Sequence, residues 1–129
     1  MGIFNRIFDK SKTSGTIQEL QNLKTKISEL PKKYQTHAFV TGPGVGTVRE
    51  QIPIISRNIN DAIRALKTGL DRYDNPITKS QISDGLKRLV FETRKPAFTG
   101  LLSTIITPTG IIELNNYMNE LEKIAVRIK

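Results

Sequence analysis

Apolar residues recur at alternating intervals of three and four along three stretches of the chain. This interval places side chains on one side of a helix, whereas a half-buried strand would make every second residue apolar. The pattern therefore favours long amphipathic helices that pack against one another lengthwise. The clearest stretch continues without a break almost to the last residue and consists of Ile111, Leu114, Met118, Leu121, Ala125 and Ile128.

An amphipathic segment precedes the first long helix. From Thr16 the spacing is helical as far as Leu30, where Pro31 is expected to end or kink the helix. The polar residues 10–15 are expected to form a linker, so that residues 1–15 stand apart from a helical domain of residues 16–129. The apolar side of the segment consists of Ile3, Phe4, Ile7 and Phe8.

The middle of the chain predicts two further helices. A glycine-rich loop at residues 42–46 precedes a helix expected to begin near Gln51 and to carry Gly69 and Tyr73 on its apolar side. Thr78 and Gln81 then have the spacing of a capping box, which predicts a helix from there to about Arg94.

A short apolar stretch from Ala97 to Ile106 has helical spacing, with a strand as the alternative because of its β-branched residues. A chain of 129 residues is long enough for one domain with a substantial core. The predicted fold is therefore all-α. We expect an antiparallel four-helix bundle with a left-handed crossing, together with this extra apolar helix and the amphipathic N-terminal segment.

Charge indicates the kind of partner. The formal net charge is +8, and the excess lies in residues 1–33, with seven basic and three acidic groups, and in residues 75–108, with five and two. Basic patches bind phosphate backbones without reading the bases, so we expect non-specific contact with nucleic acid, double-stranded DNA in particular. The alternative is a solvated basic surface. The candidate residues are Lys24, Lys26, Lys32, Lys33, Lys87, Arg88, Arg94 and Lys95.

Residues for catalysis or metal binding are sparse. The chain has no Cys and a single histidine, His37, without a nucleophile or second ligand at motif spacing. The glycine-rich loop lacks the lysine and hydroxyl residue of a P-loop. We therefore expect no enzyme activity, no metal and no cofactor.

These features predict a structural or assembly protein of the coat, virion or nucleoid type, which associates with copies of itself and contacts nucleic acid. The alternatives are a membrane-surface adaptor that uses the N-terminal segment, and a small all-α subunit of a nucleoprotein complex. The sequence shows no signal peptide and no stretch long enough to span a membrane, which predicts an intracellular or virion location. The surfaces expected to contact another copy or a membrane are Ile3, Phe4, Ile7, Phe8, Phe98, Leu101, Leu102 and Ile105.

Overall fold

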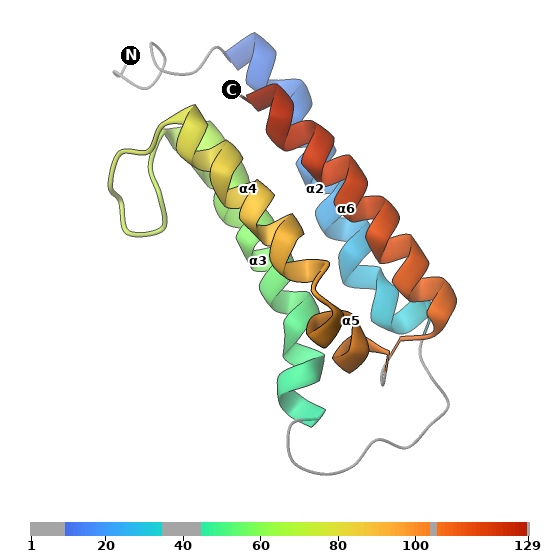
Figure 1. The fold of residues 1–129 in the computed structure, drawn as a ribbon. Helices are drawn as coiled ribbons and strands as arrows, with labels where there is room; N and C mark the ends of the chain where they lie inside the picture. Colours follow the sequence, from blue (N-terminus) through green and yellow to red (C-terminus); the bar gives the residue numbers. More distant parts are fainter. Residues whose placement is uncertain (1–9, 35–44, 104–105, 129) are drawn as a thin grey trace.

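The computed structural model describes residues 10–34, 45–103 and 106–128 of the chain. Within these ranges the fold is all-α, as the sequence predicts, and an isolated β-bridge joins Leu70 to Pro76. Five helices follow one another along the described part of the chain (Figure 1): α2 (Lys10–Lys33), α3 (Val45–Thr68), α4 (Lys79–Thr93), α5 (Pro96–Leu102) and α6 (Pro108–Ile128).

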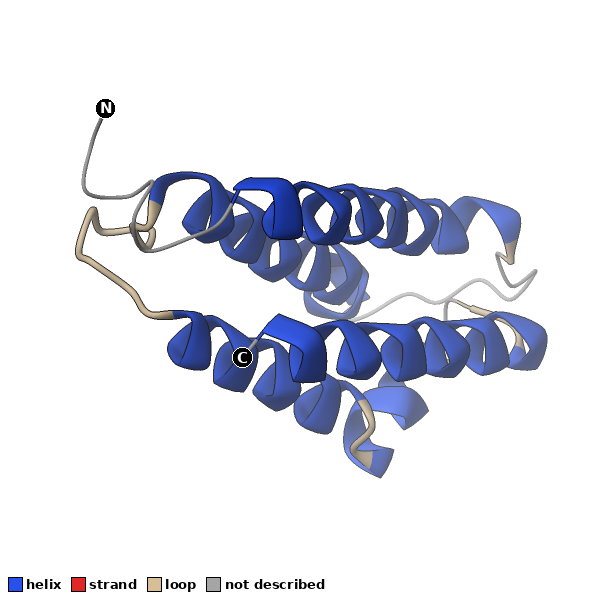
Figure 2. Ribbon diagram, turned by 90° about the horizontal axis from the view of Figure 1, so that it is seen from above, coloured by secondary structure: helices blue, strands red, loops and turns tan. Residues whose placement is uncertain are grey.

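The four long helices form two layers. One layer contains α2 and α3, and the other contains α4 and α6 (Figure 2). Each long helix contacts two others, since α2 also packs on α6 and α3 also packs on α4. The short helix α5 contacts both α3 and α4. The helices thus enclose one apolar core, and the α3–α4 contact is its least extensive side.

The apolar stretches found in the sequence supply this core. The α6 stretch from Leu114 to Ile128 is buried at each predicted position, and only Ile111 before it is partly exposed. On α2 the stretch is buried from Leu20 to Leu30. Both helices therefore bury the side that the spacing indicates.

Helix α2 is longer than predicted at both ends. It begins at Lys10 and passes through Pro31 to Lys33, so the prediction of a linker at residues 10–15 is wrong. The reason lies at Thr13, which is buried and continues the apolar spacing of Ile17 and Leu20 by one turn. Pro31 costs the helix one amide donor, but the next turn closes with the Tyr34 amide donating to the Leu30 carbonyl at 2.9 Å.

Helix α3 begins and ends earlier than predicted. It starts at Val45, within the predicted glycine-rich loop, and has Pro53 in its interior. It ends at Thr68 because Gly69 adopts φ 74°, the left-handed conformation that terminates helices. The prediction that Tyr73 belongs to the apolar side of this helix is therefore wrong, and Tyr73 is 74% exposed.

Helix α4 begins where the capping box predicts. The Gln81 amide donates to the Thr78 hydroxyl at 3.1 Å, and the Thr78 amide donates to the Gln81 side chain at 2.9 Å. Helix α5 ends at Leu102, earlier than the predicted apolar helix, and Ile106 beyond it is buried. The strand alternative does not apply to the described part of this stretch, which is helical through Leu102.

Candidate binding groove

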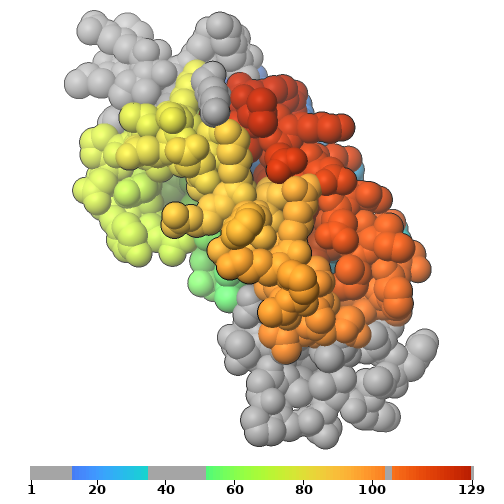
Figure 3. All heavy atoms as spheres, viewed as in Figure 1, coloured from blue at the N-terminus to red at the C-terminus, as the bar shows by residue number. Residues whose placement is uncertain are grey.

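A groove of about 730 Å³ lies between α3 and α4 and is closed at one end by α5. The spheres of Figure 3 show a hollow on the same face of the molecule, between the segments of α3 and α4. Its floor consists of side chains that belong to the core: Ile55, Ala62, Ala65, Ile82 and Leu86.

Small residues explain why the two helices leave this space. Ala62 and Ala65 on α3 and Gly85 on α4 present little side chain to one another. A Cβ atom added to Gly85 would find nothing within 4 Å. Since interiors are otherwise close-packed, an open site with an apolar floor between two helices is a common place for a partner or ligand to bind.

The walls of the groove are also apolar, although they face solvent. Ile54 of α3 is 37% exposed and Leu101 of α5 is 52% exposed. Ile77, Leu89 and Phe98 are half-buried on the same walls. Together with Tyr73 they form a continuous apolar surface, of the kind that marks binding sites when it is exposed.

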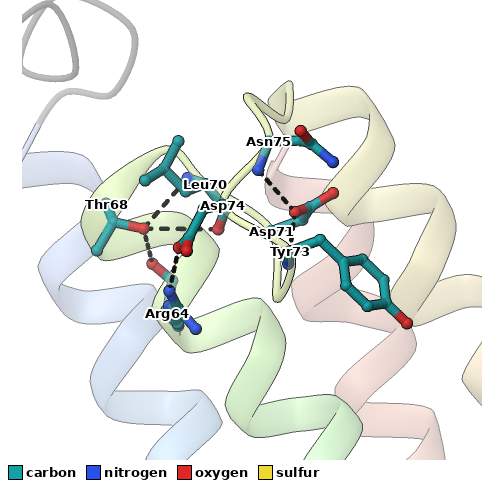
Figure 4. Close-up of polar contacts among 7 residues, drawn as sticks. All are labelled: Arg64, Thr68, Leu70, Asp71, Tyr73, Asp74 and Asn75. Carbon is teal, nitrogen blue, oxygen red and sulfur yellow. Dashed lines mark hydrogen bonds and ion pairs between the residues drawn. The ribbon is translucent and has the colours of Figure 1, made fainter.

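The turn between α3 and α4 holds Tyr73 at one end of the groove. The Asp71 carboxylate accepts from the amides of Tyr73 and Asn75 at 2.8 and 2.9 Å, and Asp74 adopts φ 63° (Figure 4). Arg64 of α3 anchors the turn through an ion pair with Asp74 at 2.6 Å. Figure 4 shows the Tyr73 ring pointing away from this network, which leaves the ring available to a partner.

Paired charges form the rim. Arg72 donates to Asp61 and to Asn58, and the neighbouring Asp61 carboxylate raises the pKa of Arg72. On α4, Glu92 lies 3.0 Å from the Lys95 ammonium. A polar rim of opposite charges around an apolar centre is the usual anatomy of a protein–protein interface.

The basic residues of the first predicted cluster do not share one surface. Lys24 donates to Asn60 of α3 at 3.1 Å. Two others reach α6 instead: the Lys33 ammonium lies 3.8 Å from Glu113, and that of Lys26 lies 5.9 Å from the Tyr117 ring centroid. Lys32 is exposed and has no ion pair or hydrogen bond with the described residues.

The second predicted cluster is likewise divided. Arg94 is turned toward α6, where it donates to Glu122 at 3.2 Å and to Asn119. Arg88 and Lys95 instead line the groove, and Lys87 is half-buried on α4. Of the eight predicted basic residues, the structure thus brings only Arg88 and Lys95 to the groove.

The predicted self-association residues fall into three groups. Phe98 and Leu101 line the groove, as a contact surface would require. Leu102 is fully buried, so its prediction as a surface residue is wrong: its side chain points into the core while Leu101 points outward. The third group lies outside the described ranges and consists of Ile3, Phe4, Ile7, Phe8 and Ile105. The single histidine, His37, also lies outside them.

Sequence reasoning missed the groove itself. The signal that could have found it is the set of small residues on two helices that are joined by one turn, namely Ala62, Ala65 and Gly85. Apolar spacing identifies the buried side of each helix but says nothing about the depth to which two such sides fit together.

Within residues 10–34, 45–103 and 106–128 the structure brings no three His, Cys, Asp or Glu side chains together in a way that could hold a metal ion. No helix in the same ranges has the length and hydropathy needed to cross a bilayer. No protein-family model, curated protein or solved structure matches the chain.

Proposed function

We propose that this chain is a non-enzymatic assembly protein that associates with copies of itself through the α3–α4–α5 groove. The observation that carries the proposal is the continuous apolar surface of the groove, to which Ile54, Tyr73 and Leu101 contribute exposed side chains. Covering apolar surface is favourable by about 25 cal/mol per Å², so an open groove of this kind gains from a protein occupant.

The rim supports an interaction site better than a reaction site. The two carboxylates Asp61 and Glu92 are each paired with a cation of the same rim, Arg72 and Lys95. General acid–base catalysis needs a group that is free to exchange a proton with the substrate, and both carboxylates are instead engaged by a neighbouring cation.

We infer for the fold an antiparallel four-helix bundle with left-handed crossings. Contacts at both ends of the α2–α6 pair support the antiparallel direction. Arg127 near the end of α6 pairs with Glu19 in the first half of α2, whereas Glu113 near the start of α6 accepts from Tyr34 beyond the end of α2. The heptad spacing supports left-handed crossings.

The net charge favours a second activity, non-specific contact with nucleic acid. Internal ion pairs join cations and carboxylates one to one, so the net charge of +8 is unchanged by them. Arg88 and Lys32, both exposed, have no ion pair with the described residues. Self-association combined with binding to phosphate backbones is what a coat, virion or nucleoid protein requires.

Multi-angle light scattering over a range of concentrations tests the self-association. We expect the mass to exceed 14.5 kDa and to rise with concentration. Leu101→Asp places a charge on the groove wall and should weaken association by about tenfold or more, which corresponds to about 1.4 kcal/mol.

The matched control is Ile112→Asp. Ile112 is 61% exposed, similar to Leu101 at 52%, but lies on α6 outside the groove. It should leave the association unchanged. A wild-type chain that stays at monomer mass at every concentration would refute the proposal, as would equal effects of the two variants.

A further inference from the structure

We propose that the groove binds the N-terminal segment Met1–Phe8 of a second copy of the chain. This inference rests on the proposed self-association and names the part of the partner that enters the groove. The sequence gives the segment an apolar side, and the groove is an apolar surface that is open to solvent.

The groove is long enough to hold the segment. The α3 wall extends from Ile54 to Ala65, a separation of about 16 Å at 1.5 Å per residue. A helix from Ile3 to Phe8 would extend over about 8 Å and present all four apolar side chains on one side. Amphipathic helices bind hydrophobic grooves through anchors spaced in this way.

The polar residues of the segment suit the rim. In such a helix Asn5, Arg6 and Asp9 would lie away from the apolar side. A helix seated with Ile3 and Phe8 on the groove floor would therefore turn these polar groups toward solvent and toward the charged rim. The rim carries charges of both signs, so neither Arg6 nor Asp9 meets a surface of its own sign alone.

The position of α2 requires the segment to come from another molecule. Ser28 and Lys24 of α2 contact Ser56 and Asn60 of α3. Asn58 lines the groove and is two positions from each of these α3 residues, which is slightly more than half a helical turn. The groove therefore lies on the side of α3 opposite to α2.

The tether between segment and helix is too short to pass around α3. Only Asp9 separates Phe8 from Lys10, where α2 begins. One residue spans about 3.8 Å, whereas a helix with its side chains is about 10 Å wide. A second copy has no such restriction, and two copies that exchange their segments would form a closed dimer.

Cysteine cross-linking tests the proposal directly, because the natural chain has no Cys. Full-length Ile7→Cys is mixed with full-length Gly85→Cys under mild oxidation, and the product is separated on a non-reducing gel. We expect a disulfide-linked species containing one chain of each kind. Gly85 suits this purpose because a new Cβ there meets nothing within 4 Å.

The matched control is Asn5→Cys mixed with Gly85→Cys. Position 5 is in the same segment but off its apolar side, so it should cross-link about tenfold more slowly if the free-energy difference is about 1.4 kcal/mol. Equal rates for positions 5 and 7 would overturn the proposal. If a chain that carries both Ile7→Cys and Gly85→Cys forms the disulfide only within itself, the proposal would also be overturned.

Two aspartate variants separate this inference from the proposed function. Phe4→Asp combined with Phe8→Asp should abolish self-association, and Asn5→Asp should not. If the double variant still associates and Leu101→Asp does not, the groove is an interface but the segment is not its occupant. If the wild-type chain never associates, both proposals fail.

The membrane alternative is decided by vesicles. Phosphatidylserine-containing vesicles are mixed with the wild-type chain and with the Phe4→Asp, Phe8→Asp variant, and binding is followed by co-sedimentation. We expect no difference between the two chains. Vesicle binding that depends on Phe4 and Phe8, together with no cross-link between positions 7 and 85, would assign the segment to the lipid surface instead.

Discussion

At the scale of single residues, Glu113 joins the end of α2 to the start of α6. Its carboxylate accepts from the Tyr34 hydroxyl at 2.7 Å and from the Tyr117 hydroxyl at 3.1 Å, and it lies 3.8 Å from the Lys33 ammonium. The hydrogen bond from Tyr34, with smaller contributions from Tyr117 and Lys33, lowers the pKa of Glu113 despite partial desolvation.

This lowered pKa predicts an acid-dependent loss of stability. A carboxyl whose pKa is lower in the folded chain stabilises the fold above its unfolded pKa, and the contribution disappears as the pH falls through the folded pKa. We expect Glu113→Gln to reduce the unfolding free energy at neutral pH. The difference in unfolding free energy between this variant and the wild type should shrink as the pH falls below 4.5, the ordinary pKa of a glutamate.

Urea unfolding at about pH 7 and pH 3 measures this gap. Glu120→Gln is the matched control, because Glu120 lies on the same helix and is exposed. As an exposed side chain it should change the unfolding free energy by less than about 0.5 kcal/mol. A Glu113→Gln gap of the same size at both pH values would show that the carboxylate charge is not what stabilises this contact.

Replacing glycine by alanine should change the stability of the fold in opposite directions at two positions. A Cβ on Gly110 would overlap the Ile106 side chain and lie 2.7 Å from the Tyr34 Cβ, whereas a Cβ on Gly85 would meet open space. Gly110→Ala should therefore destabilise the fold, by about 1–3 kcal/mol. Gly85→Ala should stabilise it by about 0.5–1 kcal/mol, because alanine loses less entropy in a helix. Thermal unfolding of both variants decides, and the same sign for both would contradict the described packing.

At the scale of elements, the start of α4 depends on one reciprocal pair. Thr78 and Gln81 bond each other's backbone amides at 3.1 and 2.9 Å. Thr78→Ala should cost about 1 kcal/mol, because an amide in the first turn loses its acceptor. Ser80→Ala, two residues further on, should change stability by less than about 0.5 kcal/mol. Chemical denaturation followed by circular dichroism compares them, and similar losses would show that the cap does not stabilise α4.

The same helix shows why some boundaries are readable from sequence. A capping box is a local signal, so the sequence alone predicted the start of α4. The other boundaries depend on tertiary packing. Thr13 extends α2 because its side chain is buried by neighbours that the sequence does not reveal. Pro31 and Pro53 lie within α2 and α3, where a proline in the sequence favours a helix end or a kink.

The candidate site was predictable only in part. Phe98 and Leu101 were identified as contact residues from their spacing, but the adjacent Leu102 was wrongly included, since a short apolar helix does not show in sequence which side is covered. Tyr73 was assigned to a helix that Gly69 ends. Glycine occurs within helices and also, in the left-handed conformation, at their C-terminal ends. Its position within an apolar stretch therefore does not show which of the two applies.

At the scale of the whole molecule, net charge opposes the proposed assembly. Two chains that each carry +8 repel one another, while the apolar groove attracts. Added salt screens the repulsion and leaves apolar burial largely intact. Binding to DNA responds in the opposite way, because it is driven by release of counterions that salt makes less favourable. Salt therefore distinguishes the two proposed activities.

Salt titrations of one protein preparation, with and without DNA, measure both. Fluorescence anisotropy with random-sequence double-stranded DNA should show affinity falling linearly on a log–log plot, and light scattering without DNA should show self-association becoming stronger. Lys32→Gln and Arg88→Gln should each reduce the slope by about 0.9 if each cation meets one phosphate. Lys33→Gln should change the slope less, because Lys33 already lies 3.8 Å from Glu113. Absence of DNA binding at low salt would refute the nucleic-acid contact and leave the groove proposal standing, whereas self-association that weakens with salt would indicate that charge pairing, and not the apolar groove, joins the chains.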